Sequence, residues 1–312
     1  MQAIVHQAFG APRHVLVHRD VERPAIGAGQ VLVRVHAVAV AKGDWLIARG
    51  LPYIARPAYG FLRPKAPVAG LEMAGVVEAV GAEVSDLRPG DAVFGWAEGA
   101  LAELAAASPD RLARKPQGLS FEEAAALPVS GTTALQAVRD AAAVQPGQSV
   151  LIIVASGAVG SFAVQISKAL GAQVTGVASA RNLSMVRELG ADAAIDYAKE
   201  SIGDGGRTFD AIVDLAGNRP IAELRAALAP DGTLVIVGGT GGKATMGFGR
   251  TIRAMLLSPF VRQELKALIS NPNQADLRTL AELTEAGTVR PRIGATFPLA
   301  QAAEAIERVG AG

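Results

Sequence analysis

The stretch from Val150 to Phe162, VLIIVASGAVGSF, constrains the fold more than any other part of the sequence. Five apolar residues are followed by the small-residue pattern Ala155-x-Gly157-x-x-Gly160 and then by an apolar helical pattern. A buried strand, a tight turn and a helix in this order form the dinucleotide-binding fingerprint, here with alanine in the place of the first glycine. Gly157 would let the backbone approach a pyrophosphate, Gly160 would let the helix pack closely on the strand, and the helix N-terminus would attract the phosphates. The predicted cofactor-binding residues of this turn are Ser156, Gly157, Ala158, Val159 and Gly160.

A membrane-spanning reading of the same region competes with this one. The run from Ser149 to Ser167 carries no charge and has roughly the length that crosses a bilayer. Gly157, Gly160 and Gln165 interrupt it, and a glycine-rich turn is unfavourable in a lone helix exposed to lipid. We therefore expect a buried strand and turn, and no membrane partner.

Composition narrows the class of protein further. The chain has 312 residues, with 30 Lys and Arg against 29 Asp and Glu, so nothing in the charge balance favours a nucleic-acid or an acidic-lipid partner. It contains no cysteine, which excludes disulfides and thiolate metal sites and fits a cytoplasmic protein. The first 15 residues, MQAIVHQAFGAPRHV, lack the apolar run of a signal peptide.

The sequence pattern changes near residue 120. Before it, short β-branched runs such as 30–40 alternate with turn signals and show no long helical pattern, which predicts an antiparallel β domain. After a capping signal, Ser120 with Glu123, strand and helix patterns alternate, which predicts a parallel sheet. The expected strands are Ser149–Val154, Gln173–Ala178, Ala211–Asp214 and Thr233–Val237, and the expected helices are Val159–Leu170, Leu183–Leu189 and Ile221–Leu228. Two more helical pieces are expected beyond about residue 270, and a loop with a basic amphipathic helix over Gly241–Gln263.

The end of the second expected strand indicates which dinucleotide is bound. An NAD site places Asp or Glu there to hold the ribose 2′-hydroxyl, but Val177 to Asn182 reads VASARN, without an acid. Ser179 and Arg181 could instead contact a 2′-phosphate, Arg181 through a charge-assisted hydrogen bond. This favours NADPH over NADH; a solvated loop arginine is the alternative reading of Arg181.

Several long motifs in order resemble one known family. They are APVAGLEMAGVVEAVG from Ala66, RPGDAVFG from Arg88, LPVSGTTALQA from Leu127, the glycine-rich turn, and ELGADAAIDY from Glu188. The chain is similar over almost its whole length to the zinc-free medium-chain dehydrogenases/reductases of the quinone-oxidoreductase type. The resemblance implies an α/β fold: a GroES-like β-barrel substrate domain (1–120, completed by about 270–312) and a doubly wound Rossmann domain (121–269). It also implies NADPH bound with its nicotinamide in the cleft between the domains, and a homodimer.

Residues of the family's cofactor site can be carried over one by one. Thr133 matches a threonine near the nicotinamide. Tyr197 matches a tyrosine lining the adenosine-phosphate pocket with Ser179 and Arg181. Gly238 matches the backbone that passes the nicotinamide ribose.

The departures from the family matter as much. Zinc-containing relatives have a histidine ligand where this chain has Leu71 and a cysteine ligand where it has Ala41, and all four histidines lie in the first 36 residues without a ligand partner at a recognisable spacing. We therefore expect no metal site. Zinc-free relatives usually read Asn-Pro-x-Asp near the nicotinamide, but this chain reads Ala41-Lys42-Gly43-Asp44. The chain also ends ERVGAG, without the final strand that the family adds to its β domain.

The expected reaction is hydride transfer to a quinone or an α,β-unsaturated carbonyl, because no zinc is expected to ionise an alcohol. Lys42 is the candidate for stabilising the negative charge that develops on the carbonyl oxygen, with an exposed turn lysine as its alternative. Trp45 and Tyr53 are candidates for stacking on a flat small-molecule substrate, although such aromatics can equally be packing residues. Two other functions stay open: a pathway-specific reductase or cyclase, and an NADPH-binding sensor with little catalysis.

Overall fold

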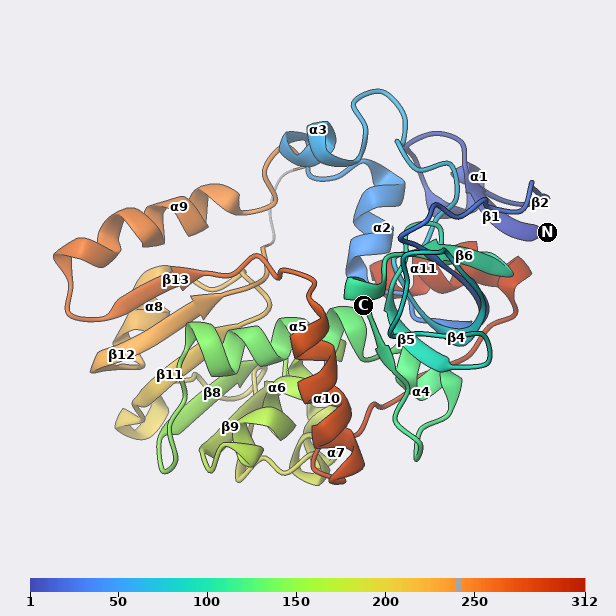
Figure 1. Cartoon of the computed structure of the whole chain (residues 1–312). Helices are drawn as coiled ribbons and strands as arrows, with labels where there is room; N and C mark the ends of the chain where they lie inside the picture. Colours follow the sequence, from blue (N-terminus) through green and yellow to red (C-terminus); the bar gives the residue numbers. More distant parts are fainter. Residues whose placement is uncertain (240–242, 312) are drawn as a thin grey trace. The chain divides into compact units, whose positions relative to one another are not determined.

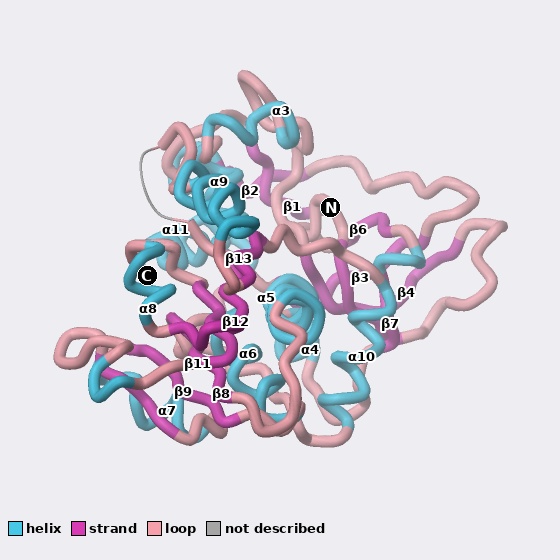
Figure 2. Tube along the Cα trace, turned by 90° about the vertical axis from the view of Figure 1, so that its left-hand side faces the viewer, coloured by secondary structure: helices cyan, strands magenta, loops and turns pink. Residues whose placement is uncertain are grey.

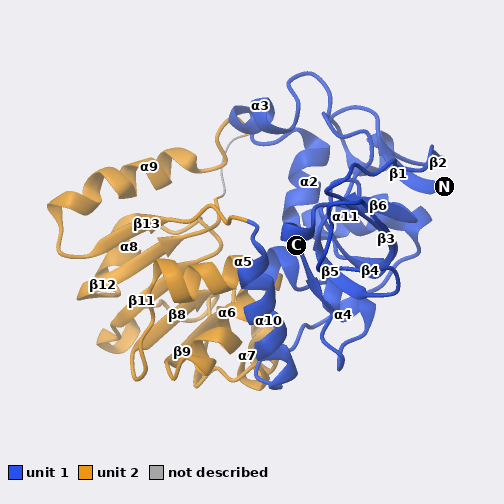
Figure 3. Cartoon of the chain, viewed as in Figure 1, with its two compact units in different colours: residues 1–132, 272–312 blue, residues 133–271 orange. Residues whose placement is uncertain are grey.

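The chain forms two compact units. A computed structural model describes residues 1–239 and 243–311. Unit 1 comprises Met1–Thr132 together with Pro272–Gly312, and unit 2 comprises Thr133–Asn271 (Figures 1 and 3). The chain therefore enters unit 2 inside one helix, α5, and returns to unit 1 for its last segment.

Unit 2 is built on a six-stranded parallel sheet with the strand order β10-β9-β8-β11-β12-β13. The chain starts in the middle, at β8, moves to one side through β9 and β10, and then crosses to the other side at β11. The carboxyl ends of β8 and β11 therefore flank a topological switch point, where open α/β sheets bind their ligands. The strands are β8 (Ser149–Ile153), β9 (Gln173–Ala178), β10 (Ala193–Asp196), β11 (Phe209–Asp214), β12 (Leu228–Ile236) and β13 (Glu264–Ala267).

Helices pack on this sheet: α6 on β8 and β9, α7 on β9 and β10, α8 on β12 and α9 on β13 (helices cyan and strands magenta in Figure 2). Leu151, Ile212 and Leu234, on three neighbouring strands, are fully buried in one apolar cluster. The helices are α5 (Pro128–Leu135), the π-helical turn η3 (Gln136–Ala141), α6 (Ala158–Ala169), α7 (Leu183–Glu188), α8 (Ile221–Ala226) and α9 (Phe248–Leu257), with short 3₁₀ turns η4 (Ala180–Asn182), η5 (Asp204–Gly206) and η6 (Ser258–Phe260).

Unit 1 is built on antiparallel strands: a two-stranded sheet, β1-β2, and a five-stranded sheet, β6-β3-β4-β5-β7. Its strands are β1 (Gln2–His6), β2 (Leu16–Asp20), β3 (Val31–Val38), β4 (Glu72–Val80), β5 (Ala92–Trp96), β6 (Leu104–Ala107) and β7 (Leu112–Arg114). Its helices are α1 (Pro12–Val15), α2 (Lys42–Arg49), α3 (Arg56–Tyr59), α4 (Phe121–Ala125), α10 (Gln274–Glu285) and α11 (Ala302–Ala311), with 3₁₀ turns η1 (Tyr53–Ala55), η2 (Pro109–Arg111) and η7 (Leu299–Gln301).

The last helix belongs to the core of unit 1. Ala302 and Ile306 of α11 are buried against Ile4 of β1 and Ala48 of α2 in one apolar cluster. The start and the end of the chain are therefore packed together within one unit.

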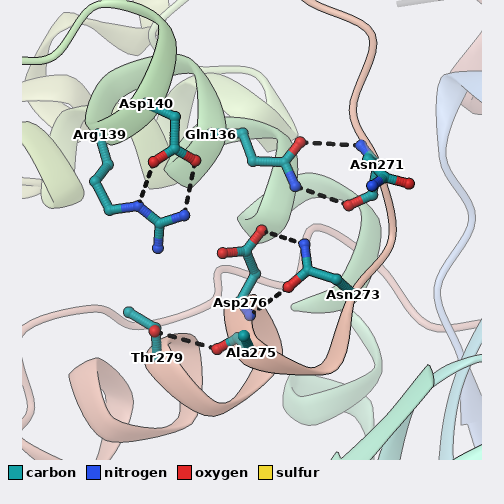
Figure 4. Close-up of polar contacts among 8 residues, drawn as sticks. All are labelled: Gln136, Arg139, Asp140, Asn271, Asn273, Ala275, Asp276 and Thr279. Carbon is teal, nitrogen blue, oxygen red and sulfur yellow. Dashed lines mark hydrogen bonds and ion pairs between the residues drawn. The ribbon is translucent and has the colours of Figure 1, made fainter. Parts of the chain in front are cut away.

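The polar contacts in Figure 4 fix the chain on both sides of the return to unit 1. Within unit 2, the Gln136 amide donates to the Asn271 carbonyl at 2.8 Å and accepts from the Asn271 N–H at 3.0 Å. Within unit 1, Asn273 caps α10 by accepting from the Asp276 N–H at 2.8 Å. The chain is therefore held by contacts within unit 2 up to Asn271 and by contacts within unit 1 from Asn273 onward.

The sequence predicted both sheet types correctly. The expected strands and helices of unit 2 agree with β8, β9, β11, β12, α6, α7 and α8 to within five residues at each end, and β9 agrees at both ends. The Ser120–Glu123 capping box forms as expected. The prediction overlooked α2, whose Gly43 and Asp44 are weak helix formers, and the four-residue strands β10 and β13. The basic helix expected over Gly241–Gln263 is α9, although Gly241 and Gly242 lie outside the described residues.

Among the residues that the structure describes, no helix is both long and apolar enough to cross a bilayer. The uncharged run from Ser149 to Ser167 is instead a strand, a turn and a helix, as predicted.

Candidate functional site

The turn after β8 leaves no room for a side chain at Gly160. A Cβ atom there would lie 2.0 Å from the Val154 carbonyl oxygen and 2.9 Å from the Ala155 Cα. Val154 itself has φ 64°, a left-handed conformation that β-branched residues rarely adopt. Such strain is concentrated at functional sites, and no local sequence pattern predicted it at this position. The N-terminus of α6 is thus fixed at the carboxyl edge of the sheet.

Gly157, the other glycine of the turn, is in a less crowded position. It is the N-cap of α6, with φ −76°, and a Cβ there would lie 3.1 Å from Val154 Cγ1 and 3.3 Å from its oxygen. These contacts are tight but can be relieved by small shifts. Packing alone therefore does not demand glycine at position 157. Glycine would be needed there if a ligand approached this backbone closely.

Ala155 takes the place of the first fingerprint glycine without blocking the turn. Its side chain is fully buried. A Cβ on Gly176 of β9 would lie 2.4 Å from Val186 Cγ1 and 2.8 Å from the Ala155 Cβ, so α7 and the turn both pack closely against β9 at this glycine.

The end of β9 is tied to the glycine-rich turn. Ser156 Oγ accepts from Asn182 Nδ2 at 3.1 Å, so η4 lies beside the turn. Ser179 is the N-cap of η4, and Arg181 within it is exposed. Sequence reasoning missed Asn182, although it belongs to the same VASARN segment. Ser156, Ser179 and Arg181 thus come together at one edge of the sheet.

Tyr197 lies at the same edge, immediately after β10. Its N–H donates to the Ala178 carbonyl at 3.2 Å, next to Ser179, and its side chain is 59% exposed. The structure therefore brings Tyr197 to the end of β9, although the two lie far apart in sequence.

A buried carboxylate organises the carboxyl end of β11. Asp214 is fully buried, and its Oδ1 accepts from the N–H groups of Ala216 at 3.2 Å and Gly217 at 2.9 Å. Its Oδ2 accepts from Arg250 Nη2 at 2.7 Å, and Arg250 Nε donates to the Arg219 carbonyl. Asp214 thereby connects α9 to the switch point. Sequence reasoning missed this pair, although an acid directly after an apolar strand was a visible signal.

Gly238 lies at the end of β12, and its N–H donates to the Asp214 carbonyl at 3.2 Å. A Cβ on Gly238 would lie 2.0 Å from the Leu215 carbonyl oxygen, so only glycine fits. Thr133, the other residue expected near the nicotinamide, is buried within α5. Gly238 thus shares its edge of the sheet with Asp214.

In unit 1, the positions of the family's zinc ligands offer no donor side chain. Ala41 is the N-cap of α2, and Leu71 directly precedes β4. Within the described parts of the chain, no three His, Cys, Asp or Glu side chains are grouped so that they could hold a metal ion.

Two buried carboxyl groups, those of Asp44 and Glu72, lie close in sequence to Ala41 and Leu71. Asp44 accepts from the Ala41 N–H at 2.8 Å, and Glu72 accepts from the Val129 N–H at 2.7 Å. Burial raises the pKa of Asp44 to about 6. Burial also raises the pKa of Glu72 well above its usual value, and the charge of Asp44 adds to this. Sequence reasoning missed the pair because burial is a property of the folded chain.

These raised pKa values predict that the protein becomes less stable as the pH rises. A carboxyl group whose pKa is higher in the folded state favours folding below its unfolded pKa, near 4, and loses that contribution as the pH passes its folded pKa. For Asp44, two pKa units correspond to about 3 kcal/mol. We expect Asp44→Asn to unfold in urea like the wild type at pH 4 and to be more stable at pH 8, by up to that amount.

Glu72→Gln should show the same trend, since an amide oxygen can still accept from the Val129 N–H. Urea unfolding from pH 4 to pH 8 measures both variants. Parallel stability curves for wild type and variants would contradict the prediction.

The structure brings Lys42 and Trp45 together on α2. Lys42 Nζ lies 4.5 Å from the centre of the Trp45 ring and donates to the Gly310 carbonyl at 2.8 Å. A Cβ on Gly310 would lie 2.0 Å from Trp45 Nε1, so α11 packs directly on the indole. Burial lowers the pKa of Lys42. Lys42 and Trp45 therefore both contact α11. One or two of the three N–H groups of the Lys42 ammonium remain for another acceptor.

Tyr53 lies apart from that pair in the turn η1 and is 46% exposed. The Arg56 guanidinium lies 4.6 Å from the centre of its ring. Tyr53 is thus about half exposed, with the Arg56 guanidinium over its ring.

Comparisons with known proteins agree with this architecture. The family described as "Alcohol dehydrogenase GroES-like domain" matches residues 27–117, and the one described as "Zinc-binding dehydrogenase" matches residues 189–312. Quinone oxidoreductase from Sus scrofa is 34% identical and is matched over 99% of this chain and 94% of its own length. The chloroplast envelope quinone oxidoreductase homolog of Arabidopsis thaliana is 31% identical over 98% of this chain and 93% of its own. The solved quinone oxidoreductase of Coxiella burnetii superposes with a TM-score of 0.87 and 30% identity, covering 100% of this chain and 96% of that one.

A parallel sheet with a dinucleotide-binding turn, joined in one chain to an antiparallel unit of the GroES-like type, defines a nicotinamide-dependent oxidoreductase. The similar proteins identify the family within this class. The chain belongs to the medium-chain dehydrogenase/reductase family, in its zinc-free, quinone-oxidoreductase-like branch.

Proposed function

We propose that this enzyme transfers a hydride from NADPH to a quinone or an α,β-unsaturated carbonyl without zinc. The observation that carries the proposal is the set of relatives named quinone oxidoreductases, 30–34% identical over nearly the full length. The residues at the zinc-ligand positions, Ala41 and Leu71, support it, because neither side chain has a donor atom.

Unit 2 would hold the cofactor. The turn around Gly157 and the N-terminus of α6 suit the pyrophosphate, while Ser179, Arg181 and Tyr197 suit the 2′-phosphate end. Thr133 and Gly238 are proposed to lie near the nicotinamide and its ribose. When bound, NADPH supplies the hydride. The protein positions it and stabilises the developing charge.

The preference for NADPH over NADH should depend on Arg181. We expect wild-type protein to bind NADPH at least tenfold more tightly than NADH, a difference of about 1.4 kcal/mol. Arg181→Ala should remove most of this difference by weakening NADPH alone, because the exposed guanidinium has no other partner among the described residues. Fluorescence titration with both cofactors measures it. Equal affinities for the two cofactors in the wild type would contradict the prediction, and Arg187→Ala on α7 is the control.

Unit 1 would hold the acceptor. Trp45 and Tyr53 are proposed to contact its flat ring, and Lys42 to donate a hydrogen bond to the oxygen on which negative charge develops. Water or a side chain would then supply the proton.

Lys42→Met tests this role. Removing one preorganised donor costs on the order of 3 kcal/mol, so we expect kcat to fall about a hundredfold while NADPH affinity stays nearly unchanged. The contact with Gly310 offers a competing explanation, because its loss should lower the unfolding temperature. Measuring kcat, KM and thermal unfolding together separates the two. A variant with lower stability but normal turnover would leave Lys42 with only the structural role.

Steady-state NADPH oxidation with quinones, enones and aldehydes, with and without a metal chelator, tests the function as a whole. Turnover of many quinones or enones, insensitive to the chelator, is expected. Turnover of a single acceptor would favour a pathway-specific reductase, and tight NADPH binding without turnover would favour a sensor. A homodimer and a cytoplasmic location belong to the same proposal. They can be tested by sedimentation velocity and by cell fractionation.

A further inference from the structure

Unit 1 presents two large apolar side chains at the tip of a loop. Phe61 is 71% exposed and Leu62 is 84% exposed, and they are neighbours in sequence. We call residues 53–65 the apical loop. Exposed apolar residues are common singly, but a contiguous apolar tip is a feature of surfaces that meet a partner.

The apical loop is held in this conformation by its own polar contacts. The Tyr59 hydroxyl donates to the Leu51 and Pro52 carbonyls, and the Lys65 N–H donates to the Tyr59 carbonyl at 2.9 Å. Gly60 has φ 129°, and a Cβ there would lie 2.0 Å from the Arg63 carbonyl oxygen. The turn that exposes Phe61 and Leu62 is therefore specified by the fold.

The charge around this tip has one sign. From Trp45 to Leu71 the sequence contains four cations, Arg49, Arg56, Arg63 and Lys65, and no Asp or Glu. Arg63 and Lys65 directly follow the apolar pair and are exposed. Arg49 and Arg56 lie against aromatic rings of unit 1. Lys65 Nζ donates to the Pro57 carbonyl at 2.9 Å, and its other two N–H groups can serve further acceptors.

We propose that the apical loop docks on an anionic lipid surface, with Phe61 and Leu62 entering the interface and Arg63 and Lys65 against the headgroups. An apolar tip flanked by cations is the pattern of interfacial anchors, and each basic residue near such a surface adds about fivefold in affinity. The expectation of no membrane partner rested on the lack of a spanning segment and on the balanced charge of the whole chain. Surface docking needs no spanning segment, and it depends on the local cations Arg63 and Lys65 rather than on the net charge. The loop also contains Tyr53, but the docking proposal rests on Phe61, Leu62, Arg63 and Lys65, none of which has a role in the reaction proposed above.

Sedimentation of the full chain with vesicles tests the docking. We expect binding to vesicles of phosphatidylcholine mixed with phosphatidylserine, little binding to phosphatidylcholine alone, and release at high salt. The double variant Phe61→Ser/Leu62→Ser should lower the partition coefficient on the order of tenfold or more, since two apolar side chains no longer enter the interface. Arg63→Glu/Lys65→Glu should abolish the preference for phosphatidylserine.

Ile269→Ser is the matched control, because Ile269 is 86% exposed but lies in unit 2 without such a charge pattern. Its binding should equal that of the wild type. Thermal unfolding checks that all variants are folded, and either double variant alone is sufficient for the test. The proposal would be overturned if wild-type binding to vesicles did not depend on phosphatidylserine, or if the double variants bound as the wild type does. Self-association without lipid, seen by sedimentation velocity and disrupted only by Phe61→Ser/Leu62→Ser, would also overturn the proposal. The apolar pair would then bind a second copy of the chain rather than a lipid surface.

Discussion

Gly160→Ala is expected to destabilise the protein by about 3 kcal/mol and to weaken NADPH binding more than tenfold. The added Cβ would lie 2.0 Å from the Val154 carbonyl oxygen, which is backbone and cannot rotate away. The first turn of α6 would have to move off β8, and its N–H groups would move with it. Urea unfolding and fluorescence titration with NADPH measure the two effects.

Gly157→Ala is the matched control in the same turn. The new methyl group would meet Val154 at 3.1 and 3.3 Å, and φ is −76°, which alanine adopts readily. We expect a stability loss below about 1 kcal/mol, together with a clear loss of NADPH affinity because the methyl group occupies the space of the pyrophosphate. If Gly157→Ala left NADPH affinity unchanged, or Gly160→Ala left stability unchanged, the roles assigned to the two glycines would be wrong.

Asp214→Ala is expected to cost about 3–5 kcal/mol of stability, the other large effect. The variant would leave the guanidinium of Arg250 and the N–H groups of Ala216 and Gly217 without their acceptor. Because these groups lie at the carboxyl ends of the sheet, we expect NADPH affinity to fall as well. Chemical unfolding with and without NADPH checks both.

Two further variants make this prediction specific. Asp231→Ala removes another Asp–Arg pair, with Arg262, but its side chains are 68% and 76% exposed, so a cost of about 0–1 kcal/mol is expected. Asp214→Asn keeps an acceptor for the two N–H groups while removing the charge, so its cost should fall between the others. Similar losses for Asp214→Ala and Asp231→Ala would show that burial does not set the strength of the Asp214 pair.

The sequence by itself determined the parallel half of the fold and its glycine-rich turn. A run of apolar residues as long as β8, followed by small residues at fixed spacing, has few alternatives, because the strand, the turn and the helix are contiguous in the chain. The same local reasoning predicted that Ser179 and Arg181 follow the second strand, and they lie directly after β9. It overlooked α2, since Gly43 and Asp44 favour turns, and the short strands β10 and β13, which become strands only by pairing with neighbours.

Only the tertiary structure decided the contacts between distant residues. Asp214 and Arg250 are 36 positions apart, and Lys42 and Gly310 are 268 apart. Neither pair has a local pattern. Asp44 and Glu72 read as ordinary acids until the fold buries them and raises their pKa values. Burial and long-range pairing depend on which surfaces the folded chain brings together, and the free energy of desolvating a charge exists only after that packing is formed.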